Sequence, residues 1–299
     1  MTARIDVRRT AKLYIGGSFP RSESGRVYEV VGADGAFLAN VSRASRKDVR
    51  DAVVAARKAQ PGWDGATAYN RGQILYRVAE MLEGRRGQLA EEIAAAEGCK
   101  PKEAAAQVDL AIDRWVWYAG WADKFHQIDG GLNPVAGPYF NLSVPEPTGV
   151  VGAIAPQGTG PGADKVGGSS LLGLVAVLAP IIVSGNTCVI VAADTRPLPA
   201  VSLAEILATS DVPGGVVNLL TGHVDELAPI LASHLDVNAI DLTGCAGTDT
   251  TELEVAAAEN VKRVVRAPAA EPDVVPVPSG PRRILAFCET KTVWHPKGI

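Results

Sequence analysis

Four short apolar runs, each rich in β-branched residues, limit the folds open to this chain more than any other feature. They cover residues 149–156, 187–191, 216–220 and 239–242. An apolar strand without polar alternation is typical of a strand buried on both faces. Helical patterns separate the runs, at residues 169–183, 199–209 and 224–233. Strands and helices that alternate in this way predict a doubly wound α/β fold around a parallel sheet.

Helical periodicity dominates the part of the chain before these runs. Two short strands come first, at residues 13–15 and 27–31. Ser45 then stands three residues before Asp48, which is the spacing of a helix capping box. Further helices are expected at residues 69–84, 88–97 and 103–125. In the last helix, four aromatic residues share one face, which predicts that they pack in the core. These residues are Trp115, Tyr118, Trp121 and Phe125.

Two other segments have the pattern of exposed strands. Residues 139–144 are flanked by prolines, which favours an edge position in a sheet. Residues 283–294 form a final strand, and its apolar run 284–287 would be exposed unless a partner covered it. The proline-rich stretch 266–281 lies between this strand and the core, and we interpret it as a linker.

The charge balance excludes several classes of partner. The net charge is −4, so neither nucleic acid nor an anionic membrane is expected to bind, since both need a basic surface. The longest apolar stretch, residues 171–183, is too short to span a bilayer. The N-terminus has no apolar signal core, and the four cysteines form no disulfide framework. We therefore expect a cytoplasmic protein.

Motifs with an obvious chemistry are scarce. The glycine cluster at residues 158–162 could cradle a phosphate, but a flexible turn explains it better. The four histidines lack the spacing of metal ligands, so no metal site is expected. Cys245 lies in a loop after a strand, where a thiolate could be activated, although a small buried side chain is the simpler interpretation.

A series of collinear motifs resembles the aldehyde dehydrogenase superfamily. The motifs are Tyr118–Lys124, Glu146–Gly152, Gly185–Thr187, Asp211–Asn218 and Asp241–Gly244. Leu13–Gly17 and Lys291–Trp294 match the two ends of that family's pattern, and the resemblance covers residues 12–266 and 283–295. The chain is most similar to the second, cysteine-less module of the fused two-module members (family sixteen), which accompanies a complete first module. Thr209–Pro213 carries this closer likeness.

The resemblance implies how the chain is divided. Residues 1–131 and 148–265 would form a Rossmann-like cofactor domain together with its N-terminal helical part. Residues 132–147 and 283–295 would form a small β oligomerisation element, made of a hairpin and a C-terminal strand. The linker, residues 266–282, stands where a family member has its catalytic domain.

At the family's functional positions, this sequence departs from the pattern. Gln157 stands near the oxyanion-hole Asn, Val191 replaces the ribose-binding Lys, and Ala267 replaces the general-base Glu. Cys245 takes the place of a Ser in the nucleotide loop, and Asp249 that of a Gly. The nucleophilic Cys has no counterpart, so no catalytic residue is expected. Remnants of the cofactor site are expected at Pro156, Asp194, Thr243, Gly244 and Cys245, with no tightly bound cofactor and at most weak binding of NAD.

Aldehyde oxidation in this family needs a thiolate, amides that hold the oxyanion, and a base. We therefore predict a non-catalytic subunit. It would bind a full-length NAD(P)-dependent aldehyde dehydrogenase through residues 132–147 and 283–295, the segments by which family members assemble. Other interpretations stay open. One is a nucleotide-sensing module that uses a cleft around Gly158, Asp194 and Gly244. Another is an active dehydrogenase with displaced catalytic groups, and a third is a scaffold that binds copies of itself.

Overall fold

The computed structural model describes residues 9–158, 170–269 and 277–298. Its central sheet has five parallel strands in the order β10-β9-β6-β7-β8. They are β6 (Val150–Ile154), β7 (Thr187–Val191), β8 (Val217–Leu220), β9 (Ala239–Asp241) and β10 (Arg263–Val265). Four of the five are the apolar runs of the sequence, so the predicted α/β fold with a parallel sheet is confirmed. The strand order reverses beside β6, which makes this the switch point of the sheet.

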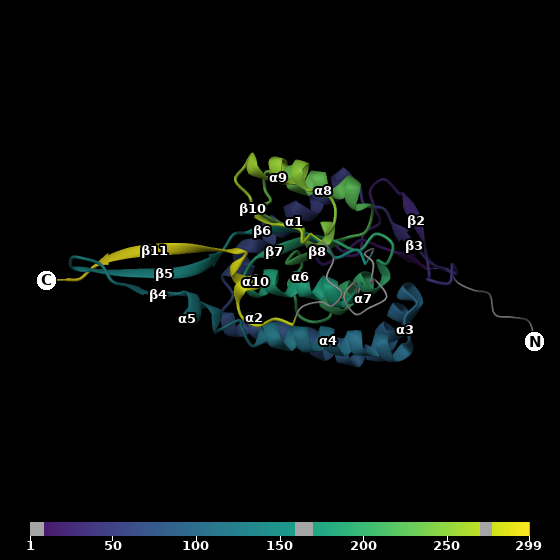
Figure 1. Ribbon diagram of the computed structural model, residues 1–299, viewed down its shortest axis with the longest axis horizontal. Coiled ribbons are helices and arrows are strands. Elements are labelled where there is room, and N and C mark those ends of the chain that lie inside the picture. The colour runs from purple at the N-terminus through teal and green to yellow at the C-terminus, as the bar shows by residue number, and fades with distance from the viewer. Residues whose placement is uncertain (1–8, 159–169, 270–276, 299) are drawn as a thin grey trace, which may run out of the picture.

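Helices cover both faces of the sheet (Figure 1). One layer contains α1 (Arg46–Asp64), α8 (Val224–Ser233) and α9 (Thr251–Ala258). The other contains α2 (Ala68–Gly84), α3 (Arg86–Glu97), α4 (Pro101–Ala119), α6 (Leu172–Val183) and α7 (Leu198–Leu207). Every residue of β6 and β7 is buried between these layers, which explains why their sequences show no polar alternation. Among the described residues, no helix is both long and apolar enough to cross a membrane.

Local signals set the start of α1 as predicted. The Ser45 hydroxyl accepts hydrogen bonds from the backbone N–H groups of Lys47 and Asp48, and the Asp48 carboxylate accepts one from the Ser45 N–H at 2.8 Å. A small sheet precedes α1, made of β1 (Thr10–Ala11), β3 (Phe37–Ser42) and β2 (Val27–Val31). The strand predicted at residues 13–15 is reduced to isolated bridges, one of which joins Tyr14 to Leu219.

The helix predicted at residues 103–125 is shorter than expected. It ends at Ala119, and Phe125 begins a separate short helix, α5 (Phe125–Asp129). The aromatic side chains of Trp115, Tyr118 and Phe125 are buried in the core as predicted. Trp121 lies in the turn between the two helices and is only partly buried against the core.

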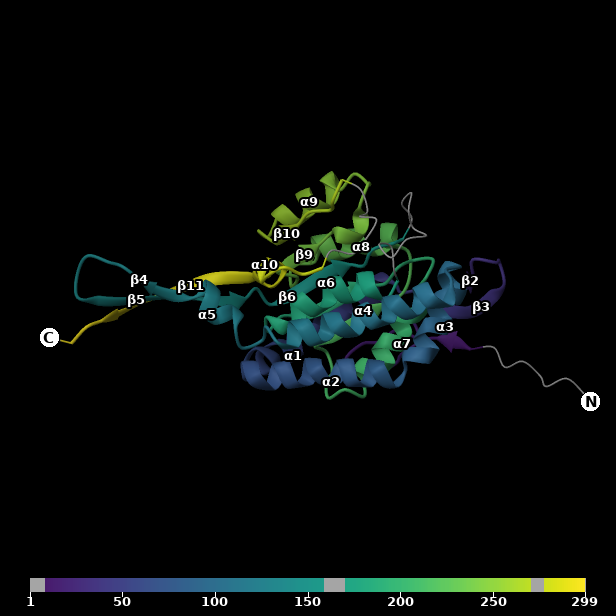
Figure 2. The same cartoon turned by 60° about the horizontal axis from the view of Figure 1, so that its bottom comes forward.

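Three strands form an arm that projects from the body of the molecule (Figures 1 and 2). They are β4 (Gly131–Asn133), β5 (Tyr139–Pro147) and β11 (Cys288–Pro296). β5 is the middle strand, so the prediction of an edge strand is wrong. Its prolines tolerate this position because β4 pairs only with residues 141–143, and Pro145 and Pro147 lie beyond that stretch.

The segment before β11 is a helix rather than the start of the last strand. α10 (Arg282–Leu285) carries Ile284 into the core, and Phe287 follows it there. Both side chains are fully buried. The expectation that residues 284–287 expose an apolar strand is therefore wrong. Ile284 and Phe287 are three positions apart, so on a helical turn they point the same way, and both reach the core.

A buried ion pair fastens this segment to the sheet. Asp241, at the end of β9, has a fully buried side chain. Its Oδ1 accepts a hydrogen bond from the Thr243 N–H at 2.9 Å, and its Oδ2 accepts one from Nη2 of Arg283 at 2.6 Å. A buried carboxylate is costly without such partners. Arg283 therefore joins the last described segment of the chain to the core sheet.

We predict that Arg283→Met lowers the free energy of unfolding by about 3 kcal/mol, because it leaves the Asp241 carboxylate buried without its cation. Urea unfolding followed by circular dichroism measures this loss. The neighbouring Arg282 is exposed and makes Arg282→Met a matched control. Equal losses in the two variants would show that the ion pair does not anchor the segment.

Candidate functional site

A cleft of about 1040 Å³ opens at the carboxyl edge of the sheet. Four of its lining residues follow four strands: Gln157 comes after β6, Asp194 after β7, His223 after β8 and Gly244 after β9. In open parallel sheets, ligands bind outside this edge, at the switch point of the strand order. The cleft is therefore the candidate functional site.

Gly244 fixes the floor of the cleft. It lies in a turn of 3₁₀ helix, residues Thr243–Cys245, that crosses the end of β6. A Cβ atom at this position would lie 2.1 Å from the carbonyl oxygen of Ala155 and 2.6 Å from that of Ile154. Any other side chain would push the loop away from the sheet, so the backbone approach requires glycine.

The Gln157 amide is bound to the backbone of the strand ends. Its Nε2 donates to the Ala155 carbonyl at 2.5 Å, and its Oε1 accepts from the Asp194 N–H at 2.9 Å. The side chain thereby bridges the ends of β6 and β7. An amide held in this way fixes the loop, because its oxygen and one of its two N–H donors are bound to the backbone.

Asp194 forms a polar cluster with two residues that sequence reasoning missed. His223 places Nδ1 at 2.9 Å from both carboxylate oxygens of Asp194. The Tyr28 hydroxyl donates to the Asp194 carbonyl at 3.2 Å, and its ring centre lies 5.4 Å from that of His223. Burial and the nearby Asp194 charge raise the pKa of Tyr28.

One signal in the sequence could have found His223. It follows the strand predicted at residues 216–220 just as Asp194 follows the strand at residues 187–191. Side chains that follow adjacent parallel strands meet at one edge of the sheet. Tyr28 offered no comparable signal, because β2 belongs to a different sheet.

The thiols near the sheet are buried and protonated. Burial raises the pKa of Cys245, which lines the cleft, to about 11, and that of Cys288 to about 12. Burial also raises the pKa values of Cys188 and Cys99. The chain has four cysteines in all, and each one is shifted away from the thiolate form at neutral pH.

The other predicted site residues lie outside the cleft lining. Pro156 packs against Gly173 of α6, the Thr243 N–H binds Asp241, and Ala267 packs against the core beside α8 and α9. Of the glycine cluster at residues 158–162, residues 159–162 are outside the described residues. Within the described ranges, no group of three His, Cys, Asp or Glu side chains could hold a metal ion.

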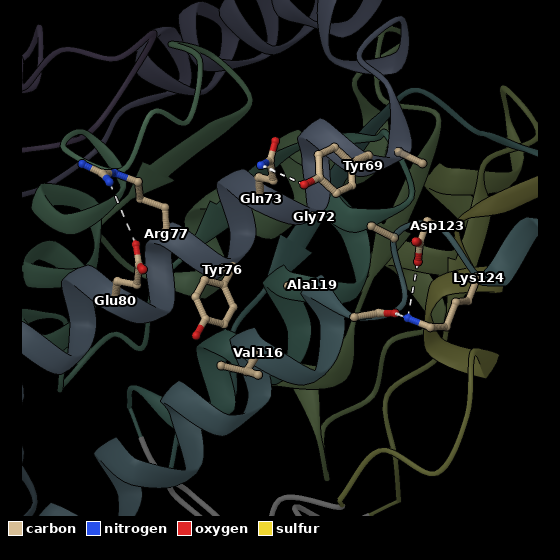
Figure 3. Close-up of a pocket in the computed structure, with 13 residues that line it drawn as sticks. Tyr69, Gly72, Gln73, Tyr76, Arg77, Glu80, Val116, Ala119, Asp123 and Lys124 are labelled. Atoms are coloured by element: carbon tan, nitrogen blue, oxygen red, sulfur yellow. Dashed lines mark hydrogen bonds and ion pairs between the residues drawn. The ribbon is translucent and has the colours of Figure 1, made fainter.

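A second hollow lies on the helical layer, between α2 and α4 (Figure 3). It measures about 630 Å³, and Tyr69, Tyr76 and Val116 line it with exposed side chains. Its charged groups are paired with each other, Lys124 with Asp123 at 3.4 Å and Arg77 with Glu80 at 4.0 Å (Figure 3). Since none of its residues follows a strand, the cleft at the sheet edge remains the candidate site.

Fold and cleft together are those of a doubly wound α/β protein with a ligand-binding edge. The pattern of the aldehyde dehydrogenase family matches residues 19–267, and the chain belongs to this family. It is 34% identical over 269 residues to human retinal dehydrogenase 2, covering 88% of this chain and 49% of that protein. It is also 34% identical to cytosolic 10-formyltetrahydrofolate dehydrogenase of Pongo abelii, covering 86% of this chain and 28% of that protein.

Solved structures agree with this assignment. The NAD⁺ complex of aldehyde dehydrogenase from Bacillus cereus superposes with a TM-score of 0.78 at 26% identity. The match covers 86% of this chain and 50% of that one. The chain thus spans about half the length of retinal dehydrogenase 2 and of the Bacillus cereus enzyme.

The described residues of the cleft do not suit the pyrophosphate of NAD(P). Five carboxyl groups line it, from Asp194, Asp225, Glu226, Asp249 and Glu252. Among the described residues, the cation that lines it is Arg43, and both its Nε and its Nη2 bind the Glu226 carboxylate. Val191, at the position of the family's ribose-binding lysine, is fully buried in β7. Like charges around the cleft repel a bound anion.

We predict that no cysteine reacts rapidly with a thiol reagent at pH 8, because a raised pKa keeps each thiol protonated. Titration with a chromogenic disulfide, in native and in denatured protein, measures the rates. Cys99 is the least buried and should react first, so Cys99→Ser should remove the fastest phase. Rates should rise above pH 9. A rapid phase that survives in Cys99→Ser would reveal an activated thiol and contradict the expectation.

Proposed function

We propose that this chain is a non-catalytic member of the aldehyde dehydrogenase family that binds a full-length aldehyde dehydrogenase through its arm. The observation that carries the proposal is an exposed apolar face on a three-stranded sheet that projects from the body (Figure 2). Exposed apolar strands of this kind are typical of protein interfaces.

The register of the arm places five of its exposed apolar side chains on one face, and Tyr139 and Trp294 on the other. Leu142 of β5 lies opposite Val293 of β11 and Leu132 of β4. Phe140 and Val144 lie two residues to either side and so point the same way. All five side chains are large and exposed, between 39% and 62%. We call these residues, Leu132, Phe140, Leu142, Val144 and Val293, the apolar face of the arm.

The proposal of a second polypeptide rests on the family resemblance. In family members, the corresponding arm pairs with the catalytic domain of a neighbouring subunit. In this chain the arm is present, and residues 266–281 lie between β10 and α10. By the resemblance, this stretch stands where a family member has its catalytic domain. The surface that covers the arm therefore comes from a different chain, and a full-length family member supplies it.

Three features support a non-catalytic role. All four thiols have raised pKa values, so none supplies the thiolate that attacks an aldehyde. The oxygen and one N–H of the Gln157 amide are bound to backbone groups. Carboxyl groups around the cleft weaken NAD(P) binding. The three features concern, in turn, the nucleophile, the group that holds the oxyanion, and the cofactor.

We predict that the chain forms a stable complex with a full-length aldehyde dehydrogenase encoded near its gene when the two are co-expressed. Size-exclusion chromatography with light scattering gives the mass. Leu142→Glu with Val293→Glu should abolish the complex, because two charges would then be buried in the interface. Val54→Glu, an exposed position on α1, is the matched control and should leave the complex intact. A free monomer, or a complex of this chain with itself alone, would contradict the proposal.

We further predict that the purified chain alone oxidises no aldehyde with NAD or NADP, because no described group can act as nucleophile. NADH absorbance with short aliphatic and aromatic aldehydes measures the rate. Turnover that persists after removal of any co-purifying dehydrogenase would show that displaced groups perform the catalysis.

A further inference from the structure

The outer face of α1 carries a stripe of positive charge, although the net charge of the chain is −4. Val49, Val53 and Trp63 are buried on the opposite side of this helix. At about 100° per residue, the cations fall within an arc of about 120° around the helix axis. They are Arg46, Lys47, Arg50, Arg57 and Lys58, and we call them the basic stripe.

The stability of the helix does not account for the basic stripe. Arg46 and Lys47 lie in the first turn of α1, where the helix dipole disfavours positive charge. The last turn of α1, where the dipole favours cations, holds no basic residue. The arrangement therefore points to a role in binding.

Two cations of the basic stripe have no partner among the described residues. The other three pair with the carboxylates of Glu23, Asp51 and Asp236, at distances of 3.0 to 3.8 Å. The side chains of Arg46 and Lys58 make neither a hydrogen bond nor an ion pair with any described group. Both residues are exposed, so their charges are available to an acidic ligand.

A groove runs beside the first half of the basic stripe, between α1 and α8. It measures about 720 Å³, and Arg46, Lys47 and Arg50 line one wall of it. Pro229 and Ile230 of α8 line the other wall. The surface therefore combines cations with apolar contacts. It continues along α1 to Val54, whose side chain is 57% exposed.

The surroundings of the groove favour an acidic peptide over a nucleic acid. Glu23 lines the groove, and Pro229 also lines the cleft at the sheet edge, where Asp225 and Glu226 stand. A nucleic acid carries a charge at every phosphate, so part of its backbone would lie against these carboxyl groups. Neither Phe, Tyr nor Trp of the described residues lines the groove to stack on a base. A peptide can place neutral residues opposite Glu23.

We propose that the basic stripe and its groove bind an acidic segment of a partner protein that also carries apolar side chains. Carboxylates of the segment pair with Arg46, Arg50 and Lys58, and its apolar side chains contact Ile230 and Val54. The distance from the first to the last of these cations is about 18 Å along the helix, the reach of about six extended residues. α1 is not part of the arm, so the inference does not depend on the proposed assembly.

Fluorescence anisotropy on the full chain tests the proposal, with a labelled peptide of repeated Glu-Glu-Leu triplets as the probe. The same peptide with Gln in place of Glu should bind about tenfold more weakly, because it lacks the charges. Raising the salt concentration should weaken binding of the acidic peptide, because salt screens exposed charges. An oligodeoxythymidine of equal length should bind more weakly than the acidic peptide.

A pair of double variants locates the binding surface. Arg46→Gln with Lys58→Gln should weaken binding of the acidic peptide about fivefold, since two ion pairs are lost. Neither side chain has a partner in the free protein, so the fold should be unchanged, and thermal unfolding checks this. Arg77→Gln with Lys102→Gln removes the same charge from exposed positions on α2 and α4 and is the matched control. It should leave binding unchanged.

Three results with folded protein would overturn the proposal. The first is no measurable binding of the acidic peptide, or equal binding of the Gln peptide. The second is tighter binding of the oligodeoxythymidine, which would assign the stripe to nucleic acid. The third is equal weakening in the two double variants, which would show that overall charge and not this surface attracts the peptide. None of them bears on the arm, which is tested by complex formation.

Discussion

Burial of the parallel sheet on both faces is the constraint on which the rest of the structure depends. β6 and β7 have no residue in contact with water, so two helical layers must cover them. Each strand then returns to the same end of the sheet through a helix, and its loop emerges at the same edge. The cleft, the His223–Asp194 contact and the close approach of Gly244 all follow from that arrangement.

Periodicity in the sequence was enough to predict most of the core, but not contacts between distant segments. The capping box at Ser45 and the strand at residues 187–191 depend on neighbouring residues, and both were predicted. The pairing of His223 with Asp194 joins two loops, and the central place of β5 depends on β11. The run at residues 284–287 is short, so its sequence alone does not distinguish a strand from a helical turn. The helical turn packs against α6, which is a contact between distant segments.

The polar groups of the candidate site are largely used by the fold itself. Gln157 bridges two strand ends, Arg43 neutralises Glu226, and the buried Asp241 holds Arg283. In each case a side chain near a ligand-binding edge has its hydrogen bonds filled by protein atoms.

The pairing of β11 with β5 has a consequence for how the protein is made. Residues 288–296 complete a sheet whose other strands lie about 150 residues earlier in the chain. A ribosome exposes β4 and β5 long before β11, so β5 lacks this partner while the residues between them are made. Until β11 pairs with it, this edge of β5 carries unpaired backbone groups.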